Sequence, residues 1–232
     1  MPGAQHQVFE AAQALFGDLP PAAIVLTHGH FDHVGALAEA TKRWSTPIYA
    51  HERELPYLTQ GVRYPRPDPS VGGAMARMSP TFPRQWVQLP RHVQSLPPDQ
   101  SVPGMPGWRW VPTPGHSAGH VSFFRERDGV LLAGDAFVTV RQEMLRAVAA
   151  QRPEVRPPPA YYTVDWTEAY DSMRRLAALE PELAATGHGQ PMSGRPLREQ
   201  LESLIADFEN RGLPPRGRYV AQTWPRRAIG QA

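Results

Sequence analysis

The feature that most constrains this chain is a short apolar run that leads directly into a cluster of histidines. Residues 22–27 read AAIVLT, and residues 27–35 read THGHFDHVG. The run is apolar and contains β-branched residues, which predicts a short strand buried inside an α/β protein. The fold must therefore accommodate three imidazoles and a carboxylate at one end of a buried strand.

The spacing within this cluster favours metal binding. His28 and His30 are two residues apart in a chain that leaves a strand, so both side chains can point the same way. Asp32 and His33 follow at the turn into a helix, where they can face a second point nearby. Imidazole and carboxylate ligands suit zinc, iron or manganese. The plainer interpretation is a polar loop in which Asp32 caps the helix.

Three more candidate ligands follow the ends of other expected strands. His116 lies in the glycine-rich segment TPGHSAGH, Asp135 ends GVLLAGD, and His188 ends LAATGH. Each is a weak signal alone, because a single polar residue at the end of a strand is more often a cap. Active sites of α/β sheets gather at strand ends, so the four segments together predict one site.

Strands and helices alternate along the chain, which predicts the α/β fold class. Helices are expected at 5–16, at 34–44, after the capping residue Asp165, and from Pro196 to Gly212. Strands are expected at 22–27, 47–50, 108–113, 120–126, 129–135 and 183–187. We expect one domain over 1–212, with 56–107 as an inserted loop region that carries some helix. Residues 213–232 are expected to form a loosely held tail rich in proline and arginine.

Composition excludes several other classes of protein. The 232 residues include no cysteine, which excludes disulfides and thiolate metal ligands. The N-terminus lacks the layout of a signal peptide, and no apolar run is long enough to span a membrane. We therefore expect a cytoplasmic protein that does not engage a membrane. The formal charge is only +2 and no basic stripe is present, so nucleic acid is not an expected partner.

The order of the histidine segments resembles one known family. THGHFDH, PGHSAGH, LLAGD and TGHG follow one another as in the metallo-β-lactamase-fold hydrolases, and the resemblance extends from about residue 5 to about residue 210. It implies an αββα sandwich but does not specify a substrate. Because the second site of the main zinc β-lactamases uses a cysteine, this chain looks closer to the hydroxyacylglutathione hydrolase and lactonase branch.

The resemblance also implies two divalent metal ions, most often zinc, with iron or manganese as alternatives. Carried over by position, the first ion would be held by His28, His30 and His116, the second by Asp32, His33 and His188, and Asp135 would bridge both. Such a pair lowers the pKa of a shared water toward neutrality, so that a bridging hydroxide can attack a carbonyl. Asp32 would orient this nucleophile or pass a proton to the leaving group. No serine nucleophile is needed, so Ser117 and Ser122 are expected to be structural.

Substrate recognition is expected in the segments between these histidines. Their apolar and aromatic residues either wall a pocket over the metals or pack the loops onto the core. Tyr161 and Tyr162 are the candidates for a hydroxyl that donates to the oxyanion. His120 could support a ligand or bond to backbone. A small-molecule ester, lactone or thioester fits best, and no clear basic cluster matches the carboxylates of glutathione.

One departure from the family leaves alternatives open. Family members begin with strands before the first helix, whereas this chain starts almost at that helix, so we expect an N-terminally incomplete sandwich and a longer natural protein. A homodimer that supplies the missing sheet edge is the alternative explanation. Three functions compete: a dinuclear metal hydrolase, which we favour, a mononuclear-iron oxidoreductase similar to persulfide dioxygenases, and an inactive truncated domain.

Overall fold

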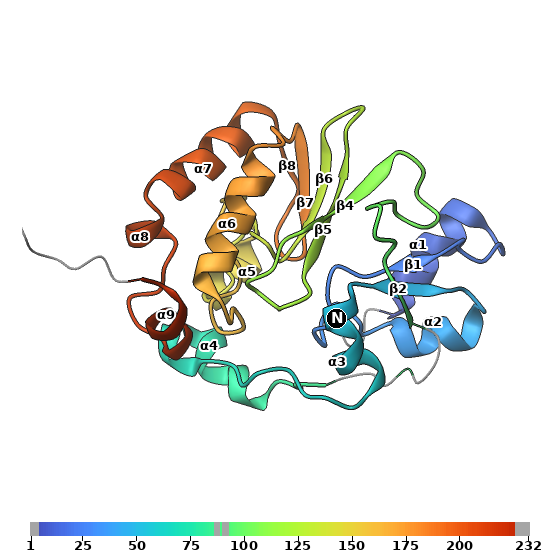
Figure 1. Ribbon diagram of the computed structural model, residues 1–232, viewed down its shortest axis with the longest axis horizontal. Helices are drawn as coiled ribbons and strands as arrows, with labels where there is room; N and C mark the ends of the chain where they lie inside the picture. Colours follow the sequence, from blue (N-terminus) through green and yellow to red (C-terminus); the bar gives the residue numbers. More distant parts are fainter. Residues whose placement is uncertain (1–4, 86–88, 90–92, 226–232) are drawn as a thin grey trace, which may run out of the picture.

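Two β-sheets with helices on their outer sides make up the molecule. The computed structural model describes residues 5–85, 89 and 93–225. Helices α6 (Trp166–Ala177) and α7 (Gly194–Ala206) cover one sheet, while α1 (Gln5–Phe16), α2 (Leu37–Arg43) and α3 (Leu55–Thr59) lie beside the other (Figure 1). This order of layers is the expected αββα sandwich.

The first sheet is small and parallel. Its strand order is β1 (Ile24–Val25), β2 (Ile48–Ala50) and β3 (Val93–Ser95), and Ile24 pairs with Ile48. The strand predicted at 22–27 is therefore present, but only two of its residues have strand geometry. Leu26, Ile48 and Leu58 pack in a core between this sheet and the helices beside it.

The second sheet has five strands in sequence order. They are β4 (Trp108–Pro112), β5 (Val121–Arg125), β6 (Val130–Gly134), β7 (Leu183–Thr186) and β8 (Met192–Ser193). All neighbours are antiparallel except β6 and β7, which are parallel because α6 connects them. The predicted hairpin turn between β5 and β6 is present, and Gly129 supplies its positive φ of 64°.

Separate apolar cores fill the spaces between the layers. Val121 and Phe123 of the second sheet pack with Val25 and Tyr49 of the first. On the other face of the second sheet, Leu131 packs with buried residues of α6 and α7. Asp165 caps α6 as predicted, because its carboxylate accepts a 3.0 Å hydrogen bond from the Glu168 amide.

In its described residues, the region between β2 and β4 contains only short elements. They are the 3₁₀ turns Glu52–Glu54, Pro69–Val71 and Ser79–Thr81, the helices α3 and α4 (Ala74–Met78), and the strand β3. Another short helix, α5 (Leu145–Ala150), lies later in the chain, between β6 and α6. Some helix was expected between β2 and β4, but β3 was not predicted. The segment passes over the end of the two sheets in Figure 1.

The prediction of a loosely held tail is wrong for residues 213–225. After α8 (Phe208–Arg211), the chain forms α9 (Arg218–Thr223), which packs against α6. The Trp224 ring lies 5.4 Å from the Phe208 ring, and the Thr223 hydroxyl accepts a 2.9 Å hydrogen bond from the Trp166 amide. Residues 226–232 lie outside the described part of the chain.

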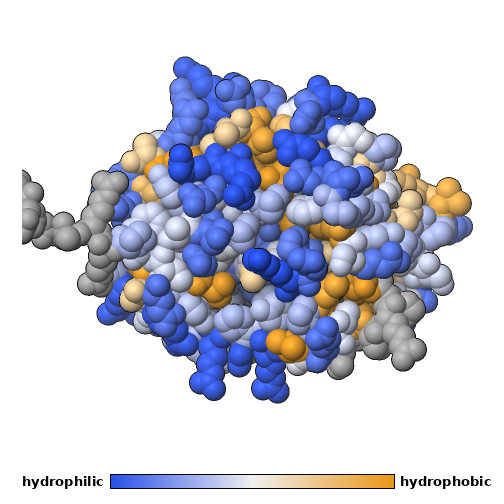
Figure 2. All heavy atoms as spheres, viewed as in Figure 1, coloured by the Kyte–Doolittle hydropathy of each residue, from blue (hydrophilic) through white to orange (hydrophobic). Residues whose placement is uncertain are grey.

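Helix α1 is the least buried element of the N-terminal half. None of its residues is buried, and Leu15 and Phe16 are 75% and 55% exposed. Apolar side chains gather on the surface at the edge where α1 lies (Figure 2). Among the described helices, none combines the length and apolar character needed to cross a membrane.

Candidate metal centre

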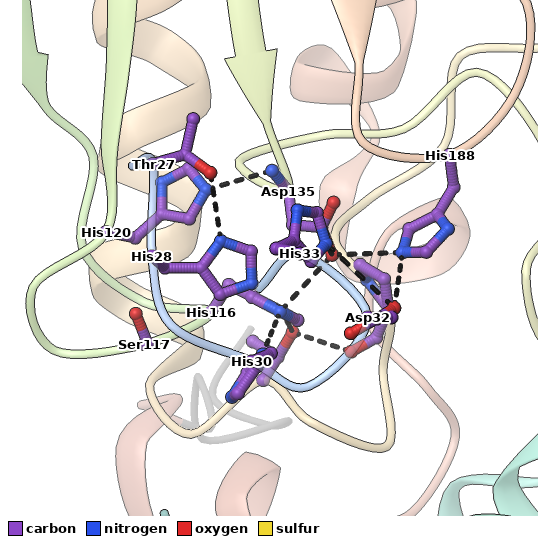
Figure 3. Close-up of polar contacts among 12 residues, drawn as sticks. Thr27, His28, His30, Asp32, His33, His116, Ser117, His120, Asp135 and His188 are labelled. Atoms are coloured by element: carbon purple, nitrogen blue, oxygen red, sulfur yellow. Dashed lines mark hydrogen bonds and ion pairs between the residues drawn. The ribbon is translucent and has the colours of Figure 1, made fainter. Parts of the chain in front are cut away.

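All seven ligands expected from the sequence meet at one end of the two sheets (Figure 3). The loop after β1 supplies His28, His30, Asp32 and His33. The second sheet supplies the remaining three from the ends of β4, β6 and β7, namely His116, Asp135 and His188.

The first group consists of three histidines. Ligand atoms of His28, His30 and His116 all lie within 4.8 Å of one another, and all three side chains are buried. His30 Nδ1 is 2.9 Å from His116 Nε2. Three imidazole nitrogens at this separation match a facial set of ligands for one divalent ion. We call these residues the histidine triad.

The second group mixes imidazole and carboxylate. Asp32, His33 and His188 also offer ligand atoms within 4.8 Å of one another. Asp32 Oδ2 is 3.3 Å from His188 Nε2 and 3.9 Å from His33 Nε2. We call these residues the mixed triad; their side chains are 13–15% exposed, so this group lies nearer to solvent than the histidine triad.

Asp135 lies between the two triads. Its Oδ2 atom is 3.3 Å from His116 Nε2, 3.3 Å from His188 Nε2 and 3.4 Å from His33 Nε2. One carboxylate oxygen is therefore within reach of ligands from both triads, as a bridging ligand requires.

Hydrogen bonds behind the ligands hold their orientation. The Asp135 amide donates to His120 Nε2 at 2.9 Å, so the proton of His120 must be on Nδ1, which lies 2.8 Å from the Thr113 hydroxyl. Burial lowers the pKa of His120 to about 3, which keeps the ring neutral. His120 therefore has the hydrogen bond to backbone that was one of the two roles considered for it, and because this amide belongs to Asp135 the bond also supports a proposed ligand.

The imidazoles of the histidine triad are neutral. Burial, reinforced by neighbouring imidazoles, holds the pKa of His28 well below its ordinary value, and burial lowers the pKa of His30 to about 4. Burial likewise lowers the pKa of His116, although Asp135 opposes the shift. Neutral imidazole is the form that binds a metal ion.

The mixed triad has the opposite electrostatics. Burial favours the neutral form of Asp32 and Asp135, but His33 and His188 outweigh it and hold both carboxyl pKa values below their ordinary range. Burial alone would lower the pKa of His188, yet the Asp135 carboxylate and the Asp32 hydrogen bond raise it to about 10. Here a metal ion must displace protons that the two carboxylates retain on the imidazoles.

Three buried polar atoms in this cluster lack a hydrogen-bond partner among the described residues. They are His28 Nε2, His33 Nε2 and Asp135 Oδ1. Buried polar groups are normally satisfied, so unpaired nitrogen and oxygen atoms that converge on common points need another partner. The donor set, which is neutral imidazole and carboxylate without thiolate, fits divalent zinc, iron or manganese.

The two candidate tyrosines lie beside the cluster within an aromatic wall. This wall consists of Phe31, Phe82, Tyr161 and Tyr162, whose rings lie 5.1–6.5 Å apart in contacting pairs. The Tyr162 ring is 4.8 Å from the His30 ring, and its buried hydroxyl has no partner among the described residues. Burial and the Asp32 carboxylate raise the pKa of both tyrosines, so both hydroxyls keep their protons.

Ser117, Ser122 and Glu54 lie around the candidate ligands and make buried hydrogen bonds. Ser122 bonds to Thr113 and to the Ala133 carbonyl, which is the structural role expected for it. Ser117 donates a 2.7 Å hydrogen bond to Glu54, a residue that sequence reasoning did not single out. Glu54 lies in the segment His-Glu-Arg-Glu at 51–54, where a glutamate is typical of a solvated charge on a short helix. No local signal in the sequence distinguishes Glu54, yet its side chain is fully buried.

The chain belongs to the metallo-β-lactamase superfamily, whose family model matches residues 2–188. Among individual relatives, the probable metallo-hydrolase YflN of Bacillus subtilis is 47% identical over 207 residues, which cover 88% of this chain and 78% of that protein. A hydroxyacylglutathione hydrolase of Xanthomonas axonopodis is 27% identical over 212 residues, covering 90% of this chain and 63% of that protein.

Solved structures show the same fold at lower identity. The BLEG-1 B3 metallo-β-lactamase has a TM-score of 0.57 at 23% identity, covering 87% of this chain and 81% of that one. TTHA1623, described in a di-iron-bound form, has a TM-score of 0.52 at 24% identity, covering 81% and 79%. The expected superfamily and fold class are thus confirmed, and the relatives indicate a metal-dependent hydrolase.

Proposed function

We propose that this protein hydrolyses a small-molecule ester, lactone or thioester at a centre that holds two divalent metal ions. The observation that carries the proposal is the pair of triads with Asp135 between them, because two ligand sets that share one carboxylate suit two ions close together. Bound there, the ions would supply an acidified water and polarise the substrate carbonyl.

The side chains have distinct tasks in this proposal. The histidine triad and the mixed triad would hold one ion each, and Asp135 would contact both. Asp32 is 15% exposed, compared with 2% for Asp135, so it is the carboxylate that faces an incoming substrate. We assign Asp32 to orient the attacking water and to pass its proton to the leaving group.

The aromatic wall would hold the acyl part of the substrate beside the ions. Its surface is largely apolar, and the two tyrosine hydroxyls are the polar groups on it. Because their raised pKa values keep them protonated, Tyr161 and Tyr162 can donate a hydrogen bond to the oxygen that becomes negative during attack. Donation at that point stabilises the transition state more than the bound substrate.

Because this chain is similar in fold to TTHA1623, which is described in a di-iron-bound form, the test must also distinguish iron from zinc. Zinc-like content of two ions per chain supports the hydrolase, while one redox-active iron per chain would favour the oxidoreductase similar to persulfide dioxygenases. Metal content by elemental analysis should therefore be measured first, followed by a panel of esters, lactones and thioesters, glutathione thioesters included.

The sharpest variant for this test is Asp135→Ala. It removes the proposed bridging ligand, so metal content should fall below two ions per chain and hydrolysis should be abolished. Asp171→Ala is the matched control, since this aspartate is exposed on α6 and pairs with Arg174. Unchanged metal content and rate in Asp135→Ala would contradict the dinuclear centre.

A further inference from the structure

The strongest unassigned feature is the buried carboxylate of Glu54. Glu54 ends a 3₁₀ turn after β2, and its side chain has no exposed surface. Glutamate is almost never fully buried unless it is paired. No ion pair to Glu54 exists within the described residues, so hydrogen bonds must compensate for its loss of hydration.

Four donors surround this carboxylate. Oε1 accepts a 2.7 Å hydrogen bond from the Ser117 hydroxyl and a 3.0 Å bond from the Gly119 amide. Oε2 accepts a 3.0 Å bond from the Gly29 amide and another from the Tyr64 hydroxyl. Both oxygens are thus doubly satisfied, which suits a group that only accepts.

Three of the four donors come from the two loops that carry the histidine triad, and the fourth, Tyr64, lies in the segment after α3. Gly29 lies between His28 and His30, while Ser117 and Gly119 directly follow His116. One side chain therefore connects the loop after β1 to the loop after β4. Packing is close at both loops, because an added Cβ on Gly29 would lie 2.6 Å from the Tyr64 hydroxyl and one on Gly119 would lie 2.8 Å from Glu54 Cγ.

The charge of Glu54 also suits this position. The histidine triad is neutral and contains no carboxylate of its own, so a divalent ion held there would receive negative charge from Asp135 and from groups behind the ligands. A carboxylate buried behind the loops supplies it where water does not screen the interaction. Groups that orient metal ligands from behind change metal affinity by about 10–100-fold.

We propose that Glu54 is a positioning residue for the histidine triad: it fixes the two loops relative to each other and strengthens metal binding there. The proposal rests on the proposed metal centre, but it does not depend on the substrate. It predicts that loss of the carboxylate weakens the histidine triad and leaves the affinity of the mixed triad near that of the wild type.

The test is Glu54→Gln, which preserves size but places an amide donor against two of the present donors. Zinc binding to metal-free protein is measured by competition with a chelator, resolving the two ions. We expect the ion at the histidine triad to bind about 10–100-fold more weakly. Amide hydrogen exchange in the metal-free protein gives a second readout, and Gly29 and Gly119 should exchange faster in the variant.

A matched control separates positioning from general stability. Asp68 is another buried carboxylate, which accepts from the Ser70 amide and hydroxyl at 3.0 and 2.6 Å and from the Arg218 amide. Asp68→Asn should lower the melting temperature without changing zinc affinity. If Glu54→Gln does the same, the role of Glu54 is only structural and the proposal is overturned.

Three further outcomes complete the test. If Glu54→Gln does not fold, Tyr64→Phe removes one donor while keeping the ring, and wild-type zinc affinity in that variant would overturn the proposal. If the wild type binds zinc but hydrolyses nothing on the panel, the proposed function fails while the effect of Glu54 on zinc affinity is still expected. A wild type that binds no zinc at either triad overturns both proposals.

Discussion

A single added methyl group at Gly187 should disturb the metal centre. Gly187 immediately precedes His188, and its backbone is not in the left-handed region, so alanine adds no backbone strain there. An added Cβ would lie 2.6 Å from His33 Cε1 and closer still to Asp135 Oδ1, whereas Cβ atoms essentially never approach within 3.0 Å of other heavy atoms. Both side chains would have to retreat by roughly 0.5 Å or more, which exceeds the tolerance of a precise site.

The expected cost follows from this displacement. Asp135 is buried and cannot move toward solvent, and His33 belongs to the mixed triad. We expect Gly187→Ala to weaken zinc binding by about 10–100-fold, which equals about 1.4–2.8 kcal/mol. The assay is stepwise zinc release to a chelator, together with the melting temperature of the metal-free protein.

Gly212→Ala is the matched control for this prediction. An added Cβ there would lie 2.8 Å from Phe208 Cγ, in a packed region that contributes nothing to either triad. It should destabilise the fold by about 1–3 kcal/mol through overpacking and leave zinc affinity unchanged. Wild-type zinc affinity in Gly187→Ala would refute the argument, because the ligands would then have room that the geometry denies them.

Three other predictions follow from the site and the C-terminal packing. Because the pKa of His188 is raised in the metal-free fold, protonated His188 stabilises that fold fully below pH 6.5, and this contribution is lost as the pH rises through about 10. Between pH 6.5 and about 10, the melting temperature of the chelator-treated wild type should therefore fall more than the melting temperature of His188→Ala. Tyr162→Phe should lower kcat at least about tenfold with metal content unchanged, and an unaltered kcat would exclude the hydroxyl from the reaction. Trp224→Ala should lower the free energy of unfolding by about 2 kcal/mol in denaturant titrations, since the ring is half-buried. An unchanged free energy of unfolding would instead support a loosely held C-terminal segment.

Much of the fold could be predicted because apolar spacing and capping residues are strong local patterns in this sequence. Apolar spacing located α1 over its observed range, and the capping aspartate located the start of α6. Strand length was less accessible: the apolar run at 22–27 gives a strand of two residues, because pairing depends on where β2 begins and ends. The helix expected from Pro196 to Gly212 is interrupted at Asp207, whose φ of −124° and ψ of 41° are not helical.

The proposed metal ligands could be predicted from the sequence, whereas Glu54, which lies behind them, could not. The strand-end rule anticipated that residues from His28 to His188 would meet, because strand ends lie at a common edge. Nothing comparable marks Glu54, whose burial arises only when the segment after β2 folds against two distant loops. The helix at 218–223 was also missed, since six residues among prolines carry too little periodicity to indicate a helix.

The distribution of the seven ligands over both sheets has a consequence for folding. Four of the proposed ligands follow a strand of one sheet and three follow strands of the other, so an ion shared between them would cross-link residues far apart in a chain that has no cysteine. Because the unfolded chain does not present the assembled site, such an ion would stabilise the folded state through its own binding free energy. Removal of the ions by a chelator would then resemble reduction of disulfide bonds in a secreted protein. It would remove the cross-link between the two sheets and make the chain more susceptible to proteolysis.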